Sequence, residues 1–98
     1  MTTSADPYVL IVHEVADYPA WKKVFDEAAG IRKTAGERSY RVLCDSRDAR
    51  KVVHFSSWTS LEAARRFFES PELVEIRKKA GVKAPEFHYL DSIESGIL

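Results

Sequence analysis

The stretch "YVLIVHEV", residues 8–15, decides the fold. It is rich in β-branched residues and has the length of a strand. Alternation along a strand places Val9 and Ile11 on one face and Leu10 and Val12 on the other, so both faces are apolar. An antiparallel sheet with one wet face alternates apolar and polar residues instead. We therefore expect this strand to be covered on both sides.

A helix follows the first strand. Asp17 is placed to cap it, and Pro19 falls in its first turn, where proline is tolerated. Residues at three- and four-residue spacing give it one apolar side, and Gly36 ends it. The residues at this spacing are Trp21, Val24, Phe25, Ala28, Arg32 and Ala35.

Two further strands are predicted over residues 38–44 and 51–58. The polar turn between them, "DSRDAR", makes them a natural hairpin.

Two more helices follow this hairpin. Thr59 and Glu62 match a capping box, which opens a helix carrying Ala and Phe on its apolar side. Ser70 and Pro71 stop that helix and begin the next, which Gly81 ends.

A last strand over residues 86–93 completes the order β-α-β-β-α-α-β, an α+β plan of the ferredoxin-like type. Right-handed crossovers place all helices on one face of a four-stranded antiparallel sheet, in the order 4-1-3-2. A second copy, sheet against sheet about a two-fold axis, is the simplest cover for the other face. We expect one domain over residues 1–98, flexible over 1–6, that forms a homodimer. A different partner protein and a tolerated exposed patch are the alternatives.

The composition is that of an ordinary globular protein: 98 residues, 45% hydrophobic, 31% charged, with a net charge of 0. A nucleic-acid or membrane-surface binder needs a basic excess, so neither partner is expected. The single cysteine, Cys44, excludes an intrachain disulfide, fits a reducing cytoplasm, and is expected to be a small buried hydrophobe. No apolar segment has the length of a signal peptide core or a membrane span, so we expect a cytoplasmic protein.

Two segments carry a resemblance to a known family: "DYPAWKKVFDEAAGIRKTAG", residues 17–36, and "VVHFSSWTSLEAARRFFESPEL", residues 52–73. The chain resembles the antibiotic-biosynthesis-monooxygenase-like proteins of the dimeric α+β barrel superfamily. The resemblance implies two sheets facing each other across a dimer interface, and a pocket between sheet and helices in each subunit. The superfamily includes quinone-forming monooxygenases without a cofactor, haem-degrading enzymes, cyclases, isomerases and members of no known activity. The resemblance therefore implies the fold more firmly than the reaction.

The haem-degrading branch is tested by two positions. Aligned on Trp58 and Ser70, its helical tryptophan falls on Phe67 and its haem-ligating histidine on Arg77. A guanidinium offers only donors and cannot ligate iron. Haem degradation is therefore not expected. An asparagine that this branch carries late in its first strand falls near His13.

Three histidines, His13, His54 and His88, lie in predicted strands. If residues near 15 oppose residues near 86, His13 and His88 are cross-strand neighbours, whereas a slip of one residue separates them. A pocket that these histidines line would offer a general base near neutral pH. The alternative is that each one packs separately. His13 is the predicted catalytic residue because it breaks an apolar run, and His54 and His88 are predicted to bind the ligand.

Aromatic side chains are numerous for so small a domain. Trp21 and Phe67 are predicted as apolar walls of a ligand cavity, although aromatic residues at helical spacing are often simply core. We find no signature for a nucleotide, a flavin or a metal, so neither a cofactor nor a metal site is expected.

Three functions stay open from the sequence. The first is a cofactor-free enzyme of the monooxygenase, cyclase or isomerase kind, acting on a small aromatic or polyketide-like substrate. The second is a dimeric module that binds a small apolar molecule or a partner without converting it. The third is a dimer without a pocket.

Overall fold

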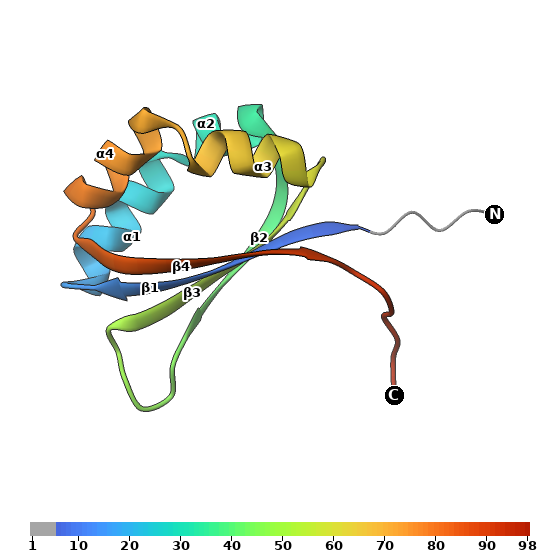
Figure 1. Ribbon diagram of the computed structural model, residues 1–98. Helices are drawn as coiled ribbons and strands as arrows, with labels where there is room; N and C mark the ends of the chain where they lie inside the picture. Colours follow the sequence, from blue (N-terminus) through green and yellow to red (C-terminus); the bar gives the residue numbers. More distant parts are fainter. Residues whose placement is uncertain (1–5) are drawn as a thin grey trace.

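Residues 6–98 are described by the computed structural model, so most of the predicted flexible segment 1–6 lies outside the described residues. The sheet contains β1 (Pro7–Val15), β2 (Glu37–Cys44), β3 (Lys51–Trp58) and β4 (Val82–Asp91). Its order is β2-β3-β1-β4 with every neighbouring pair antiparallel, which confirms the predicted order. The helices α1 (Tyr18–Glu27), α2 (Ala29–Ala35), α3 (Leu61–Phe68) and α4 (Pro71–Lys79) all lie on one face (Figure 1).

The helix caps and bounds agree with those predicted from the sequence, with one cap and one helix as exceptions. The Asp17 carboxylate accepts from the Ala20 amide at 3.1 Å, and Ser70 caps α4 as predicted. The predicted cap Thr59 is wrong by one residue, because the Ser60 hydroxyl accepts from the Ala63 amide at 3.0 Å. The single helix predicted up to Gly36 is two helices, because the backbone at Ala28 leaves the helical region.

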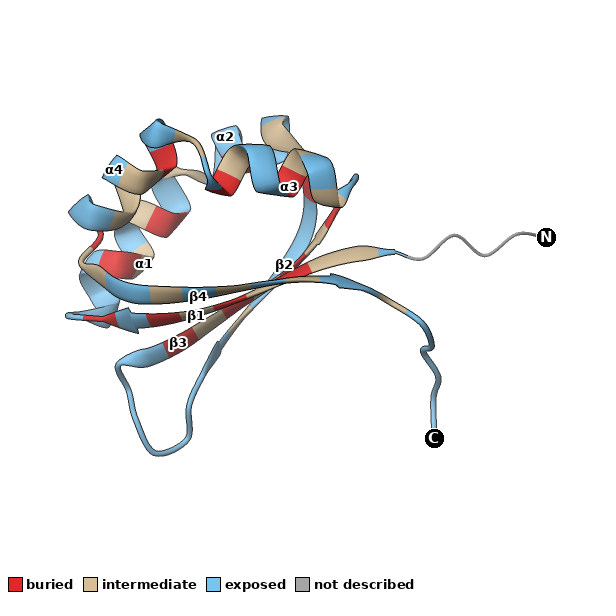
Figure 2. Cartoon of the chain, viewed as in Figure 1, coloured by how far each residue is buried: buried red, intermediate tan, exposed pale blue. Residues whose placement is uncertain are grey.

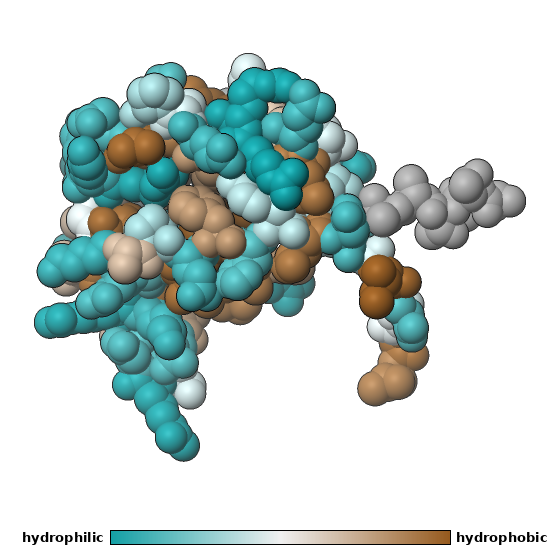
Figure 3. Space-filling model, viewed as in Figure 1, coloured by the Kyte–Doolittle hydropathy of each residue, from teal (hydrophilic) through white to brown (hydrophobic). Residues whose placement is uncertain are grey.

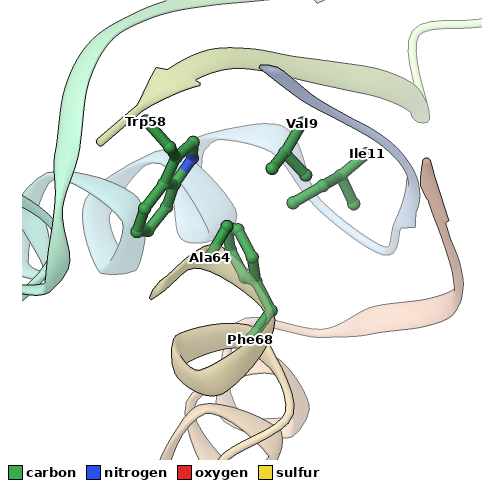
Figure 4. Packing of buried hydrophobic residues seen from close by; sticks show 5 residues of the cluster. All are labelled: Val9, Ile11, Trp58, Ala64 and Phe68. Atoms are coloured by element: carbon green, nitrogen blue, oxygen red, sulfur yellow. The ribbon is translucent and has the colours of Figure 1, made fainter. Parts of the chain in front are cut away.

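The hydrophobic core lies between the sheet and the helices, where the buried residues of β1 and β3 face those of α1 and α3 (Figure 2). One cluster brings together residues from β1, β3 and α3 (Figure 4): Val9, Ile11, Trp58, Ala64 and Phe68. A second cluster lies at the other end of the sheet: Val15, Trp21, Phe25, Val52 and Ala80. Apolar residues are visible in the band between helices and sheet, under a polar helical surface (Figure 3).

β4 begins earlier than predicted, at Val82 rather than Glu86, and its register with β1 contains a bulge. Val12 pairs with Glu86 and Glu14 with Lys83, so two residues of β4, Ala84 and Pro85, lie opposite the single residue between them. Ala84 has a φ of 44°, and Pro85 has no N–H to donate to the ladder. Bulges re-aim side chains and are common beside active sites. The residue opposite this bulge is His13.

The second face of the sheet carries the apolar side chains that the first strand predicted. Leu10 and Val12 lie across β1 from Phe55 and Val53 of β3, and all four side chains are partly exposed. No helix covers this face (Figure 1). The prediction for Cys44 is wrong: it is exposed, because it ends the edge strand β2.

Gly36 joins α2 to β2 and positions Glu37, the first residue of β2. Substitution of this glycine tests that role. A Cβ there would lie 2.6 Å from the Thr59 hydroxyl, and its φ of 127° disfavours other residues. We expect Gly36→Ala to lower the free energy of unfolding by about 1–3 kcal/mol. Gly30→Ala, where an added Cβ meets nothing within 4 Å, should raise it by about 0.5–1 kcal/mol. Chemical denaturation measures both, and equal effects of the two substitutions would contradict this account of Gly36.

Candidate functional site

A cavity lies between the sheet and the helices, where the family resemblance implied a pocket. Its volume is about 60 Å³. Aliphatic and aromatic side chains form most of its wall, and the polar groups on it are two histidines and two arginines: His13, Arg32, His54 and Arg77. An apolar cavity with a few convergent polar groups is typical of a small-molecule site.

Three buried polar side chains, Arg32, Glu37 and His54, form a cluster. One carboxylate oxygen of Glu37 accepts from Arg32 Nη1 at 2.7 Å, and its other oxygen lies 2.7 Å from His54 Nε2. Arg32, Glu37 and His54 are exposed by only 5%, 8% and 3%. Burial of ions costs solvation free energy, which a cluster offsets only when its groups are paired. Here one carboxylate pairs with both donors.

Aromatic rings hold this cluster in place. The Arg32 guanidinium lies 3.7 Å from the centre of the Phe25 ring and donates to the Phe25 carbonyl oxygen at 3.1 Å. The His54 ring meets Phe25 edge to face, with centroids 4.9 Å apart. Tyr40 lies on the outer side of both groups. The orientation of the His54 ring is therefore fixed by packing as well as by its hydrogen bond.

His13 lines the same cavity from β1, opposite the bulge, and is 5% exposed. Its Nδ1 is buried without a hydrogen-bond partner. Burial, and then the nearby His54 and Arg77, lower the pKa of His13 to about 3. This histidine is thus neutral at physiological pH, and its unpaired nitrogen is available to a ligand.

The other predicted pocket residues divide into two groups. Trp21 and Phe67 line the cavity as predicted, and Trp21 lies 5.5 Å from the His13 ring, centre to centre. Of the two arrangements that the sequence left open, the one that makes His88 a neighbour of His13 does not occur. His88 opposes Leu10, which places it on the other face of the sheet, where its Nε2 lies 2.8 Å from Glu86.

Three charged residues of the site were not predicted. One of the three is marked in the sequence, because Arg32 occupies an apolar position in the helical spacing. Nothing in the local sequence marks Glu37, whose partner His54 is distant along the chain. Arg77 stands where the haem-degrading branch has its ligating histidine, and the sequence predicts no role in a pocket for it. Its Nη1 donates to the Phe68 carbonyl at 2.9 Å, and it forms no ion pair within residues 6–98.

Among residues 6–98, no three His, Cys, Asp or Glu side chains gather in a way that could hold a metal ion. No helix in this part of the chain is long and apolar enough to cross a membrane.

The fold is a ferredoxin-like domain with an apolar cavity between its two layers. The family model described as antibiotic biosynthesis monooxygenase matches residues 18–79, more than half of the chain. The chain therefore belongs to the antibiotic biosynthesis monooxygenase family. No curated protein matches the sequence.

Several solved structures share the fold at low sequence identity. SnoaB, a cofactor-independent oxygenase from Streptomyces nogalater, is 15% identical, with a TM-score of 0.74 over 95% of this chain and 97% of that chain. A Streptomyces coelicolor monooxygenase in complex with nanaomycin D is 20% identical, with a TM-score of 0.64 over 96% and 92%. Rv0793 from Mycobacterium tuberculosis is 18% identical, with a TM-score of 0.65 over 93% and 99%.

The low pKa of His13 makes stability depend on pH. The ordinary value is 6.5 and the folded value about 3, so the unfolded chain takes up a proton below pH 6.5 that the folded chain refuses. Stability is present above that pH and is lost as pH falls towards 3. Between pH 7.5 and 5.0, His13 should cost roughly 2 kcal/mol of unfolding free energy.

His13→Gln removes this proton uptake. Denaturant unfolding at pH 7.5 and 5.0 should show that the free energy of unfolding falls by roughly 2 kcal/mol more in the wild type than in the variant. Equal losses in the two proteins would show that His13 titrates normally in the folded state.

Proposed function

We propose that this protein is a cofactor-independent monooxygenase acting on a small acidic phenol or enol of the aromatic polyketide kind. The observation that carries the proposal is the apolar cavity with an unpaired, buried His13 nitrogen on its wall. Family membership and the likeness to SnoaB, a cofactor-independent oxygenase, support the reaction class. The relative that binds nanaomycin D supports the substrate class.

The chemistry needs only a substrate that can be ionised. In this proposal His13 contacts the acidic hydroxyl, and a histidine of the cavity takes its proton. The electron-rich anion reduces dioxygen, one oxygen atom becomes the new carbonyl of a quinone, and the other leaves as water. All four electrons come from the substrate, so the balance requires no external reductant. The positive charge of Arg77 favours the anion.

The volume of the cavity limits which substrates it can hold without a change of shape. A dry engineered cavity that binds benzene has about 150 Å³, against about 60 Å³ here. A substrate with one or more rings must therefore separate the helices from the sheet as it enters. Trp21 and Phe67, on α1 and α3, are the walls that we propose to move.

A second function is favoured by the low pKa of His13, which makes it a weak base in the empty cavity. On this alternative the domain binds a small apolar molecule and does not convert it. A ligand that raises the melting temperature but is recovered unchanged would identify this function.

We propose further that the protein works as a homodimer, as proteins of this family typically do, and in the cytoplasm, as the sequence predicts. The apolar second face of the sheet supports the dimer, since burial of such a face in a partner copy removes it from water. Tyr8 and Phe55 stack on this face with ring centres 5.1 Å apart, which extends the apolar surface.

The dimer is tested by a charge in the middle of that face. Val12→Lys should give a folded monomer, because the added charge would lose its hydration at the contact, a cost that its cross-strand neighbour Glu86 offsets only in part. Ile31→Lys, on the helical layer, is the control and should leave the dimer intact. Light scattering after size exclusion reads the mass, and a Val12→Lys dimer would contradict the proposed face.

The oxygenase activity is tested with 1,5-dihydroxynaphthalene and the larger 1,8-dihydroxyanthrone as probes. One O₂ should be consumed for each quinone formed, in excess of the rate without protein. His13→Ala should lower turnover at least about 10²-fold while the cooperative unfolding transition is retained. His88→Ala, on the other face of the sheet, should keep turnover. No oxygen uptake with either probe, together with their recovery unchanged, would favour the binding function.

A further inference from the structure

The hydrogen bond between Glu37 and His54 determines which nitrogen of His54 carries a proton. An ionised carboxylate can only accept, so neutral His54 must carry its proton on Nε2, 2.7 Å from the Glu37 oxygen. Its Nδ1 then bears a lone pair. This nitrogen has no hydrogen-bond partner within residues 6–98, and the ring lies on the cavity wall.

Arg32 makes this arrangement rigid. It holds the second carboxylate oxygen of Glu37 at 2.7 Å and is itself fixed by the Phe25 carbonyl and ring. The guanidinium is always charged and has no acceptor. Glu37 therefore has one oxygen committed to Arg32 and the other to His54.

We propose that His54 is the catalytic base of this site and that Glu37 is its positioning residue. The inference rests on the proposed function and names the atom that the reaction needs. The substrate O–H bond breaks, its electron pair stays on oxygen, and the proton binds the lone pair of His54 Nδ1. The proton is later returned to the oxygen atom that leaves as water, which takes its second proton from the C–H bond that breaks as that carbon becomes the new carbonyl.

The charges favour His54 over His13 for this step. Arg32 and Glu37 cancel, so proton uptake makes the cluster cationic beside the new anion, with the Glu37 carboxylate against the imidazolium. His13 has no carboxylate partner, and burial favours its neutral form. His13 thus serves as a hydrogen-bonding group and His54 as the proton acceptor.

A purely structural role explains the cluster less well. Replacement of buried ion pairs by apolar residues is often neutral or stabilising, so such pairs are weak evidence for a stabilising role. A carboxylate that fixes the tautomer of an imidazole on a cavity wall is a recurring element of catalytic sites.

Glu37→Gln tests the tautomer directly. Because Arg32 can only donate, the new amide must turn its oxygen towards Arg32 and its NH₂ towards His54 Nε2. That nitrogen must then accept, which moves the histidine proton to Nδ1 and removes the lone pair from the cavity. The substitution keeps the shape of the side chain but blocks the base.

Two measurements read this change. Long-range ¹H–¹⁵N spectra, with His54 assigned by His54→Asn, should show the proton on Nε2 in the wild type and on Nδ1 in Glu37→Gln. With 1,5-dihydroxynaphthalene as the probe, kcat should fall about 10²- to 10⁴-fold with little change in KM. Glu86→Gln is the matched control, because Glu86 pairs with His88 outside the cavity, and it should leave kcat unchanged.

Three results would overturn the inference. They are a wild-type His54 proton on Nδ1, full turnover in Glu37→Gln despite a switched tautomer, and a His54 Nδ1 resonance that does not respond when the probe saturates the cavity. Failure of the oxygenase proposal is a separate result: neither probe is oxidised, yet the probe still shifts the Nδ1 resonance of the wild type and not that of Glu37→Gln.

Discussion

The carboxylate of Glu37 is the one acceptor shared by two buried donors, and the site depends on it. Without it, Arg32 would be a buried cation with no counter-charge, and His54 would lose the bond that sets its tautomer. The backbone serves this arrangement: Gly36 turns the chain from α2 into β2, and the next residue points into the core. A turn that only glycine makes easily thus places the most consequential charge of the domain.

The central strand β1 relates this site to the proposed assembly. Its odd-numbered residues, from Val9 to Val15, face the helices, and His13 is among them. Its even-numbered residues make the apolar centre of the other face. Substitutions that alter the twist of β1 would therefore change the shape of the cavity and of the second face together.

The sequence was sufficient where local patterns decide the structure. Strand alternation and helix spacing predicted the strands and the helical layer, and the ferredoxin-like plan predicted the sheet order. For His13, His54, Trp21 and Phe67 the sequence left a ligand cavity and simple core packing as alternatives, and all four side chains lie on the cavity wall. The sequence did not predict features that depend on contacts between residues distant along the chain. The bulge at Ala84 and Pro85 changed the register and separated His88 from His13. The pairing of Glu37 with His54, and the small size of the cavity, follow from packing that no local pattern records.

The strand order also bears on how the chain folds during its synthesis. β1 is the first strand of the described chain, and one of its two neighbours, β4, is the last. Until β4 emerges, an apolar strand has one unpaired edge, and such an edge can pair with another chain. Pairing of distant segments is slow because loop closure must come first. The nascent protein is therefore most prone to aggregate just before β4 is synthesised, and chaperone binding to the unpaired edge of β1 matters most at that stage.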